Sequence, residues 1–344
     1  MSTRAPRTTA LVLAYGDEPV LVECVEAILS SEDVDVDVVL VDNGCTSGAV
    51  DELAGRPGIT VVRPGENTGF AGGCNLAARH ARGEVLVLVN GDAVVRPGAI
   101  AALSRAACLP GAGLATSSLR LYERPDHMNS AGNPVHYLGL SWAGGLGDPA
   151  TAHAEPRDVA SGSGAALAVR RDTWEALDGF WEPMFAYCED AELSLRCWQR
   201  GLNVRYVPDA VVLHRYEFSR NPTKNYLLER NRLLLLLTLL ERRTLLAILP
   251  PVVGLELAIW AIAARQGWGR DKVRGWRWIW QHRREVRARR AEVQAARTRT
   301  DADLLPGLLT GRVTPGEDTG LSVPGPLNAL AATYWSLVRR VVLR

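Results

Sequence analysis

The chain has 344 residues, 47% of them hydrophobic, which is enough to bury one large core or a core with an accessory region and excludes a disordered chain. Its formal net charge of +1 argues against a general attraction to nucleic acid, so no nucleic-acid partner is expected. Six cysteines without a CxxC pair favour buried thiols in a reducing compartment over a disulfide framework or a zinc site.

The first part of the chain predicts an α/β fold with a mainly parallel sheet covered by helices. The apolar run at 10–14 is too short for the core of a signal peptide and predicts a first strand, which favours a cytoplasmic protein. Strand-like runs at 11–15, 36–42, 59–62 and 84–90 alternate with helical patterns near 18–30 and 70–81. Ligands bind beyond the carboxyl ends of strands in such sheets, so residues 15–17, 42–44 and 90–92 are the first candidates for a binding site.

The rest of the chain changes in character. Residues 120–160 are rich in Gly, Pro, His and Asn, which predicts long loops over a site rather than core. The stretch 244–264 is apolar apart from Glu256, and Pro250 and Pro251 are expected to break any helix there. Twelve Arg or Lys against three acids follow in 265–299, interleaved with four tryptophans.

These shifts divide the chain into three predicted parts. Residues 1–225 form the α/β domain, and 226–300 form a helical region that is both apolar and basic. A linker rich in Pro and Gly and a C-terminal amphipathic helix occupy 301–344.

Acidic residues and one histidine carry the chemical signals. Asp92 follows a strand-like run and could hold a divalent cation, although Asn-Gly-Asp is equally typical of a tight turn. The acids at 189, 190 and 192 open a helical pattern, where acids usually complement the helix dipole, and Glu192 is expected to be solvated. His214 follows a strand-like run and the turn predicted at 208–209, and a lone histidine is more often structural than a ligand.

Taken together, these residues and their neighbouring motifs resemble the family 2 glycosyltransferases, especially the rhamnosyltransferase and galactofuranosyltransferase branch, over roughly residues 8–235. The matching segments are VDNG at 41–44, NTGFAGGCN at 67–75, VNGDA at 89–93, GAALAVRR at 164–171, GF at 179–180, ED at 189–190, the histidine at 214 and ERNR at 229–232. The sequence departs from the family pattern at Asn90, where many relatives have Asp, and at Cys188.

The resemblance implies a GT-A nucleotide-diphospho-sugar transferase fold, with a Rossmann-like, mainly parallel sheet and a helical, membrane-associated C-terminal extension. It implies that Asp190 is the catalytic base of an inverting transfer, that Glu189 and Gly164 orient the acceptor, and that Asp92 and His214 hold Mg²⁺ or Mn²⁺. The residues that it assigns to the donor nucleotide are Ala14, Tyr15, Asp42, Asn67, Gly69, Phe70, Asn75, Asn90 and Gly91.

The partners implied are a nucleotide-diphosphate sugar, with dTDP-rhamnose as the first expectation, and a lipid-linked, cell-surface or natural-product acceptor. Tryptophan and arginine in 265–299 favour peripheral or re-entrant attachment to an anionic membrane surface at its cytoplasmic face, over a span through 244–264. If the protein does not bind membranes, the same helices are expected to form a homo-oligomer interface. Two other functions stay open: an inactive scaffold or glycan-binding subunit, and a sugar-phosphate nucleotidyltransferase, whose GxGxR loop the N-terminus lacks.

Overall fold

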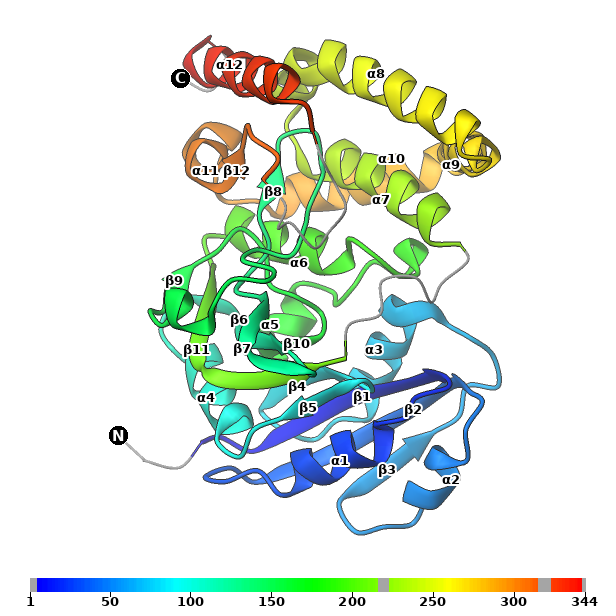
Figure 1. Cartoon of the computed structure of the whole chain (residues 1–344), viewed down its shortest axis with the longest axis vertical. Helices are drawn as coiled ribbons and strands as arrows, with labels where there is room; N and C mark the ends of the chain where they lie inside the picture. The colour runs from blue at the N-terminus through cyan, green and yellow to red at the C-terminus, as the bar shows by residue number, and fades with distance from the viewer. Residues whose placement is uncertain (1–4, 216–222, 315–322, 342–344) are drawn as a thin grey trace.

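A ten-stranded sheet lies at the centre of the part of the chain described by the computed structural model, which is residues 5–215, 223–314 and 323–341 (Figure 1). Its main path runs β3 (Ile59–Val62), β2 (Val36–Cys45), β1 (Thr8–Gly16), β4 (Val85–Asn90), β10 (Ala166–Arg170), β6 (Ala112–Leu121), β11 (Asn203–His214) and β5 (Ala93–Val95). β7 (Arg124–Ser130) and β9 (Arg157–Asp158) pair with β6 and β11. β10 and β5 run antiparallel to their neighbours, and the other strands on the path are parallel.

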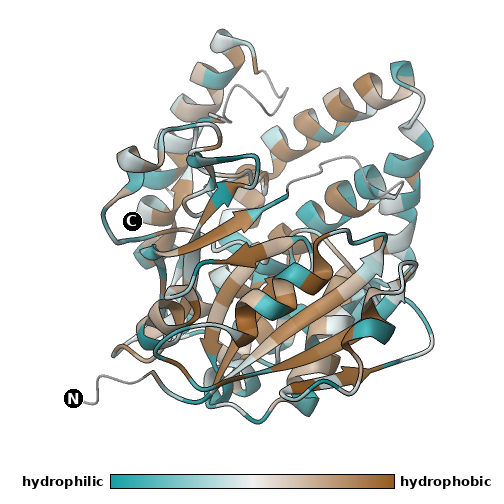
Figure 2. Cartoon of the chain, turned by 60° about the horizontal axis from the view of Figure 1, so that its bottom comes forward, coloured by the Kyte–Doolittle hydropathy of each residue, from teal (hydrophilic) through white to brown (hydrophobic). Residues whose placement is uncertain are grey.

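Helices cover both faces of the sheet because each strand alternates its apolar side chains between the two faces. In β1, Ala10 and Val12 pack on one face, against α1 (Leu21–Leu29), α2 (Ala49–Leu53) and α4 (Ala99–Ala107). Leu11 and Leu13 pack on the other face, against α3 (Gly69–His80), α5 (Arg171–Ala176) and α6 (Glu189–Gln199). Hydrophobic colour runs along these strands in Figure 2. The strands and helices predicted for the first 90 residues are thus confirmed within a few residues.

The C-terminal helices form a second core on the far side of α6. They are α7 (Lys224–Leu239), α8 (Arg242–Arg265), α9 (Gly269–Gln281), α10 (Arg283–Ala296), α11 (Asp301–Leu308) and α12 (Gly325–Val341). The leucines of α7 pack there against Val286 and Val293 of α10. α8 and α12 form the outermost layer, at the top of Figure 1 and at the opposite end from α1 and α2.

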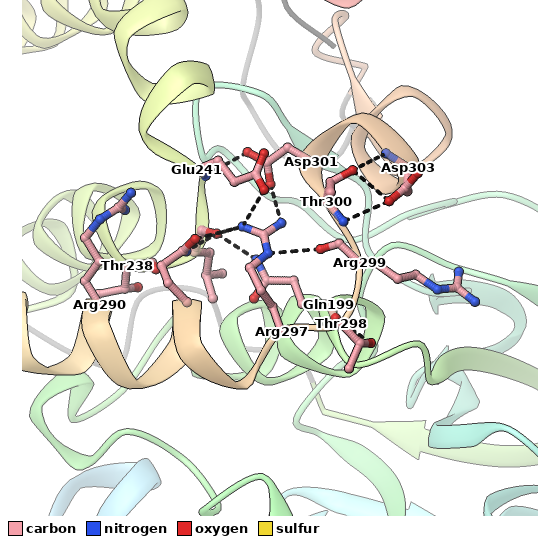
Figure 3. A network of polar contacts seen from close by, with 12 residues as sticks. Gln199, Thr238, Glu241, Arg290, Arg297, Thr298, Arg299, Thr300, Asp301 and Asp303 are labelled. Atoms are coloured by element: carbon pink, nitrogen blue, oxygen red, sulfur yellow. Dashed lines mark hydrogen bonds and ion pairs between the residues drawn. The ribbon is translucent and has the colours of Figure 1, made fainter. Parts of the chain in front are cut away.

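A polar network fastens this second core to α6 (Figure 3). The side-chain amide of Gln199, at the end of α6, donates to the backbone carbonyl of Leu239 over 2.7 Å. The backbone carbonyl of Gln199 accepts from the N–H of Thr298 over 2.8 Å. Asp301 is fully buried, pairs with Arg297 at 2.7 Å and accepts the N–H of Glu241 at 2.7 Å. The C-terminal helices therefore share buried polar contacts with the α/β core. The segment predicted as a linker also begins with ordered structure, namely α11 and β12 (Leu309–Thr310).

The sequence predicts long loops rather than core for residues 120–160, but part of this segment lies in the core. β7, the short strand β8 (Val135–His136) and the 3-10 helix η1 (Ala150–His153) lie there, and Met128, Tyr137 and Leu138 are buried. Tyr137 stacks on Trp335 of α12 with 5.0 Å between ring centroids, and β8 pairs with β12. These core partners lie far along the chain, so local periodicity gives no sign of them.

Three further expectations are wrong. Pro250 and Pro251 lie inside the continuous helix α8, and the hydroxyl of Tyr334 donates over 2.6 Å to the carbonyl of Ala247, which Pro251 cannot bond. The turn expected at 208–209 is a bulge within β11, where the register with β6 shifts. Glu192 is not solvated: it is fully buried and paired with Arg196 at 2.7 Å.

The cysteines are buried only in part. All six thiols are free, as the spacing predicts, and Cys24, Cys74 and Cys197 are buried. The other three, Cys45, Cys108 and Cys188, are partly exposed, which corrects the expectation that all of them are buried.

Candidate active site

The carboxyl ends of β1, β2 and β4 bring together the first group of predicted donor residues. Ala14, which is buried, pairs with Asp42 across β1 and β2, and Leu13 pairs with Asn90 across β1 and β4. A Cβ on Gly91 would lie 2.9 Å from the Leu13 carbonyl oxygen, so the chain at Gly91 fits against the end of β1 only without a side chain. The topology thus places these residues where ligands bind in such sheets.

Tyr15 and Asp42 lie at this edge of the sheet. Tyr15 is 49% exposed, and its ring borders Gly44, where a Cβ would lie 3.8 Å away from it. One carboxylate oxygen of Asp42 accepts the N–H of Cys45 over 3.1 Å, which links the last residues of β2 to one another. An aromatic face and a carboxylate at one open edge can bind a base and a ribose hydroxyl.

Asn43 joins the end of β2 to the next predicted segment, a role that the sequence motifs do not assign. It is buried, its Oδ1 accepts from the N–H and the hydroxyl of Thr68, each at 2.9 Å, and its Nδ2 donates to Asn67 and to the carbonyl of Gly69. Asn67 in turn accepts the N–H of Gly69. Asn43 is therefore a scaffold for the loop, and its place directly after a predicted strand is the one sequence signal for it.

Gly69 is required at the start of α3. Its φ is +74°, and a Cβ there would lie 2.5 Å from the carbonyl oxygen of Phe185. The N–H of Ala71 donates to the same oxygen over 3.0 Å. Phe70 borders Gly164, where a Cβ would lie 3.1 Å from the ring. The donor segment at 67–75 thus contacts the chain that leads to the predicted catalytic acids.

Asn75 lies away from the strand ends. Its Nδ2 donates to the carbonyl of Phe180 over 2.9 Å and to Glu182, which begins the 3-10 helix η2 (Glu182–Met184), and its Oδ1 accepts the N–H of Phe180. Both ends of the amide therefore hold α3 against the turn at 179–182. A donor contact by Asn75 stays a prediction.

Asp190 and Glu189 differ sharply in environment although they are adjacent at the start of α6. Oδ2 of Asp190 accepts the N–H of Gly164 over 3.1 Å, and Oδ1 accepts the N–H of Ala191 over 2.7 Å. Oε2 of the buried Glu189 has no hydrogen-bond partner among the residues that the structure describes. Burial and the charge of Asp190 raise the pKa of Glu189 to about 8. Burial also raises the pKa of Asp190, but its hydrogen bonds from backbone N–H groups oppose this shift, so of the two acids Asp190 is the better placed to carry the negative charge.

Asp92 and His214, the predicted metal ligands, meet where β5 pairs with the end of β11. His214 pairs with Ala93, and its Nε2 lies 3.2 Å from Oδ1 of Asp92. Nδ1 faces Oδ1 of Asn129 over 2.9 Å and can donate a hydrogen bond to it, which leaves Nε2 facing the carboxylate of Asp92. Asn129 is buried in a segment without clear periodicity, and no sequence signal points to it.

This donor set fits a divalent cation. Two acceptors that face each other need a shared cation, either a proton on Nε2 or a metal ion. Ligands at right angles, each about 2.1 Å from a metal ion, lie about 3 Å apart, close to the separation of these two atoms. In the described part of the chain no group of three or more His, Cys, Asp or Glu side chains is placed to hold a metal ion. A cation here would take its remaining ligands from water or substrate oxygens.

Comparisons with known sequences show the family of the chain. Residues 6–233 match the family described as Glycosyltransferase like family 2. The chain is 28% identical over 242 residues to an N-acetylglucosaminyl-diphospho-decaprenol L-rhamnosyltransferase of Mycobacterium tuberculosis (strain CDC 1551 / Oshkosh), covering 62% of this chain and 78% of the relative. It is 29% identical over 119 residues to the succinoglycan biosynthesis protein ExoO of Rhizobium meliloti (strain 1021), covering 34% of each.

Solved structures resemble the fold. A mannosyltransferase PcManGT from Pyrobaculum calidifontis, in complex with GDP-Man and Mn²⁺, has a TM-score of 0.52 at 19% identity and covers 98% of this chain and 88% of its own. GalNAc-T7 with UDP, GalNAc and Mn²⁺ has a TM-score of 0.57 at 16% identity over 68% of this chain, which spans about half, 49%, of that protein. At these identities the likeness shows the fold alone, and it confirms the predicted GT-A fold.

Proposed function

Because the chain belongs to glycosyltransferase-like family 2, we propose that it transfers a sugar from a nucleoside-diphosphate donor to an acceptor hydroxyl, with inversion at the anomeric carbon. The observation that carries this proposal is Asp190, a carboxylate held by two backbone N–H groups beside the buried Glu189, whose pKa is raised to about 8. Such a carboxylate can take the proton of the acceptor hydroxyl as its oxygen attacks the sugar. A single displacement inverts the anomeric carbon, so no second carboxylate is needed as a nucleophile.

Glu189 and Gly164 support the base in different ways. The N–H of Gly164 aims the carboxylate of Asp190, and a Cβ at Gly164 would press on the ring of Phe70. Neutral Glu189 can donate a hydrogen bond to the acceptor or simply avoid a second charge beside the base. Both roles are consistent with residues that orient the acceptor.

The donor diphosphate is proposed to lie between the ends of β1, β2 and β4 and the pair Asp92 and His214. These two residues would hold Mg²⁺ or Mn²⁺, with Asn129 fixing the tautomer of His214. When bound, the cation offsets the negative charge that develops on the departing diphosphate. Both solved structures described above contain Mn²⁺, which supports this choice.

The substrates that we propose are taken from the name of the mycobacterial relative. The mycobacterial protein is named for L-rhamnosyl transfer to N-acetylglucosaminyl-diphospho-decaprenol, so we propose a rhamnose donor such as dTDP-rhamnose and a lipid-linked glycan acceptor. A lipid-linked acceptor requires the enzyme to work at a membrane. The six free cysteines fit the cytoplasmic face, where thiols stay reduced.

The layer of α8 and α12 is our proposed membrane contact. α8 is the one helix in the described residues that is long and apolar enough to cross a membrane, and only 11% of its most apolar 18-residue stretch is buried. Most of the exposed large apolar side chains of this layer follow one helical stripe on each helix, although Ile262, also exposed, lies off the stripe of α8. The stripe residues are Leu246, Leu249, Val253, Leu257 and Trp260 on α8, and Leu327, Leu330, Leu337 and Val341 on α12. Exposed arginines flank them at 242, 243, 265, 339 and 340.

The contacts of α8 favour a helix that lies in the plane of the membrane surface. Glu256 in its middle is buried against Arg232 of α7 and pairs with Lys272 of α9 at 2.8 Å. Tyr334 of α12 bonds the carbonyl of Ala247. Moving α8 into a transmembrane position would break this buried charge cluster, which is costly. An amphipathic layer with a basic rim suits the headgroup region instead.

The test is a screen of nucleotide sugars with the full-length protein. We expect dTDP-rhamnose to give release of dTDP and a new glycosidic bond on a polyprenyl-diphosphate N-acetylglucosamine acceptor. The anomeric configuration of the product, read by NMR, should be opposite to that of the donor. Binding of nucleotides without transfer or hydrolysis of any donor would support the inactive scaffold instead.

A further inference from the structure

The backbone that leads into α6 is strained. Phe185, Tyr187 and Cys188 have φ values of 65°, 70° and 67°, in the left-handed region that side chains other than glycine rarely adopt. Cys188 directly precedes Glu189 and Asp190, so the direction of the first turn of α6 depends on this segment. Strained backbone persists only where the surrounding structure holds it.

Asn231 of α7 is the main contact that holds it. Its amide Nδ2 donates to the carbonyls of Met184, Ala186 and Tyr187, at 2.8, 2.9 and 2.7 Å. The side chain is completely buried, and its Oδ1 accepts from Arg230 over 2.9 Å. The two N–H groups of one amide are thus shared among three carbonyls of the strained segment and tie it to α7.

The other side of the segment is held by the donor-binding loop. The carbonyl of Phe185 accepts the N–H of Ala71, and Gly69 lies against the same oxygen. Arg230 adds a donor to the carbonyls of Pro183 and Met184 at 2.7 and 2.9 Å. The segment 184–188 is therefore clamped between α3 and α7, and the buried side chains of Asn231 and Arg230 form the clamp on the α7 side.

We propose that Asn231 is a positioning residue for the catalytic step: it fixes the strained segment so that the Asp190 carboxylate meets the N–H of Gly164 and faces the acceptor. This inference rests on the proposed function of Asp190. Asn231 touches neither the predicted donor site nor Asp190, so its loss should change the alignment of the base more than the affinity for the nucleotide. A misplacement of about 1 Å in such a group can lower a rate about 100-fold.

The experiment compares Asn231→Asp and Asn231→Ser with Thr238→Ala. Asp keeps the size of Asn but replaces the amide donor by an acceptor, and Ser keeps a single donor. Thr238 is the matched control, because it is also fully buried on α7 and its hydroxyl bonds only the carbonyl of Leu234. We expect kcat to fall about 10- to 100-fold in Asn231→Asp and less in Asn231→Ser, with KM for the donor within about threefold.

A second measurement does not depend on turnover. Hydrogen exchange of peptides covering 183–192 should be faster in both Asn231 variants than in wild type and in Thr238→Ala, while exchange in β1 and β4 stays unchanged. Unchanged exchange in 183–192, or equal losses of kcat in Asn231→Asp and Thr238→Ala, would overturn the inference. A wild-type protein without transferase activity would overturn the proposed function alone, since the exchange comparison would still report whether Asn231 holds the segment.

Discussion

The backbone N–H of Gly164 donates a hydrogen bond to Oδ2 of Asp190 over 3.1 Å, which ties the chain just before β10 to the first turn of α6. Gly164 is buried, so this bond is shielded from water and favours the ionised carboxylate. Asp190 therefore has a fixed direction and a hydrogen bond that favours its charged form, and a general base needs both a direction and a charge.

Asp190→Asn should abolish turnover while leaving nucleotide binding nearly intact. The amide oxygen can still accept from Gly164, but the side chain can no longer take a proton. We expect kcat to fall at least about 100-fold, with the Kd for the nucleotide within about threefold. Asp172→Asn, an exposed carboxylate at α5 paired with Arg170, is the control and should retain activity. Activity of Asp190→Asn within tenfold of wild type would remove this residue from the mechanism.

Glu189→Gln should change how stability depends on pH. Because burial and Asp190 raise the pKa of Glu189 to about 8, the folded protein keeps a proton that the unfolded chain releases at lower pH. The contribution of this carboxyl to the free energy of unfolding is complete below its unfolded pKa and is lost as pH rises toward about 8. It amounts to about 1.4 kcal/mol for each unit by which the folded and unfolded pKa values differ. We expect the Tm of wild type to fall between about pH 5 and about pH 9, and that of Glu189→Gln to fall less. Parallel curves for the two proteins would contradict the protonated Glu189.

Asp92→Ala and His214→Ala should each weaken the metal-dependent binding of the nucleotide diphosphate. Calorimetric titrations with and without Mg²⁺ or Mn²⁺ measure this, and we expect the metal to strengthen binding at least about tenfold in wild type and much less in either variant. The exposed His80→Ala is a control for the loss of a histidine. If affinity is the same in all four proteins with and without metal, a metal-independent enzyme is the better interpretation.

Gly69→Ala should damage the donor loop, and Gly65→Ala supplies its control. Both glycines have a positive φ, +74° and +83°, so both substitutions strain the backbone by about 1–2 kcal/mol. At Gly65 the new methyl group meets no atom within 4 Å, whereas at Gly69 it would lie 2.5 Å from the Phe185 oxygen. We expect a clearly larger loss of Tm and of nucleotide affinity in Gly69→Ala. Equal effects in the two variants would mean that the contact with Phe185 is unimportant.

The sequence predicts the sheet and the strand ends well because both depend on local patterns. The run at 84–90 alternates Val and Leu toward two helical layers, and β4 occupies Val85–Asn90. Asp92 follows this strand directly, so its position at the sheet edge can be read from the chain. The meeting of Asp92 with His214 depends on the pairing of β5 with β11, to which only the family resemblance points.

Contacts between distant segments account for what the sequence does not reveal. Glu256 is a charge in an apolar stretch, and its partners Arg232 and Lys272 lie on two other helices. Glu192 is one of several acids at a helix start, and only the packing of α10 places Arg289 beside it. Asn129 lies on β7 and contacts His214 at the end of β11, so this pair too joins segments that are far apart in the sequence. Periodicity describes one element at a time and cannot report such pairs.

The last prediction concerns the α8 and α12 layer. Removing everything after residue 240 is a poor test, because it would expose the leucines of α7 that pack on Val286 and Val293. Substitution of Leu249, Val253 and Leu257 by Gln changes only side chains that are 51%, 47% and 57% exposed. We expect this triple variant to lose most of its flotation with anionic liposomes while keeping its nucleotide affinity. Leu109 lies just after α4 in the α/β part of the chain and is 49% exposed, so Leu109→Gln is the control and should float like wild type.

Salt and alkali distinguish the modes of attachment. If α8 lies at the interface, high salt should weaken binding of the full-length protein in part, because it screens the attraction between the exposed arginines and anionic lipid, while apolar insertion keeps some protein bound. Alkaline extraction should then release it. A protein that resists both treatments has α8 across the membrane. Complete solubility at low salt would rule out the membrane surface, and sedimentation of the same sample would then show whether these stripes join two copies of the chain.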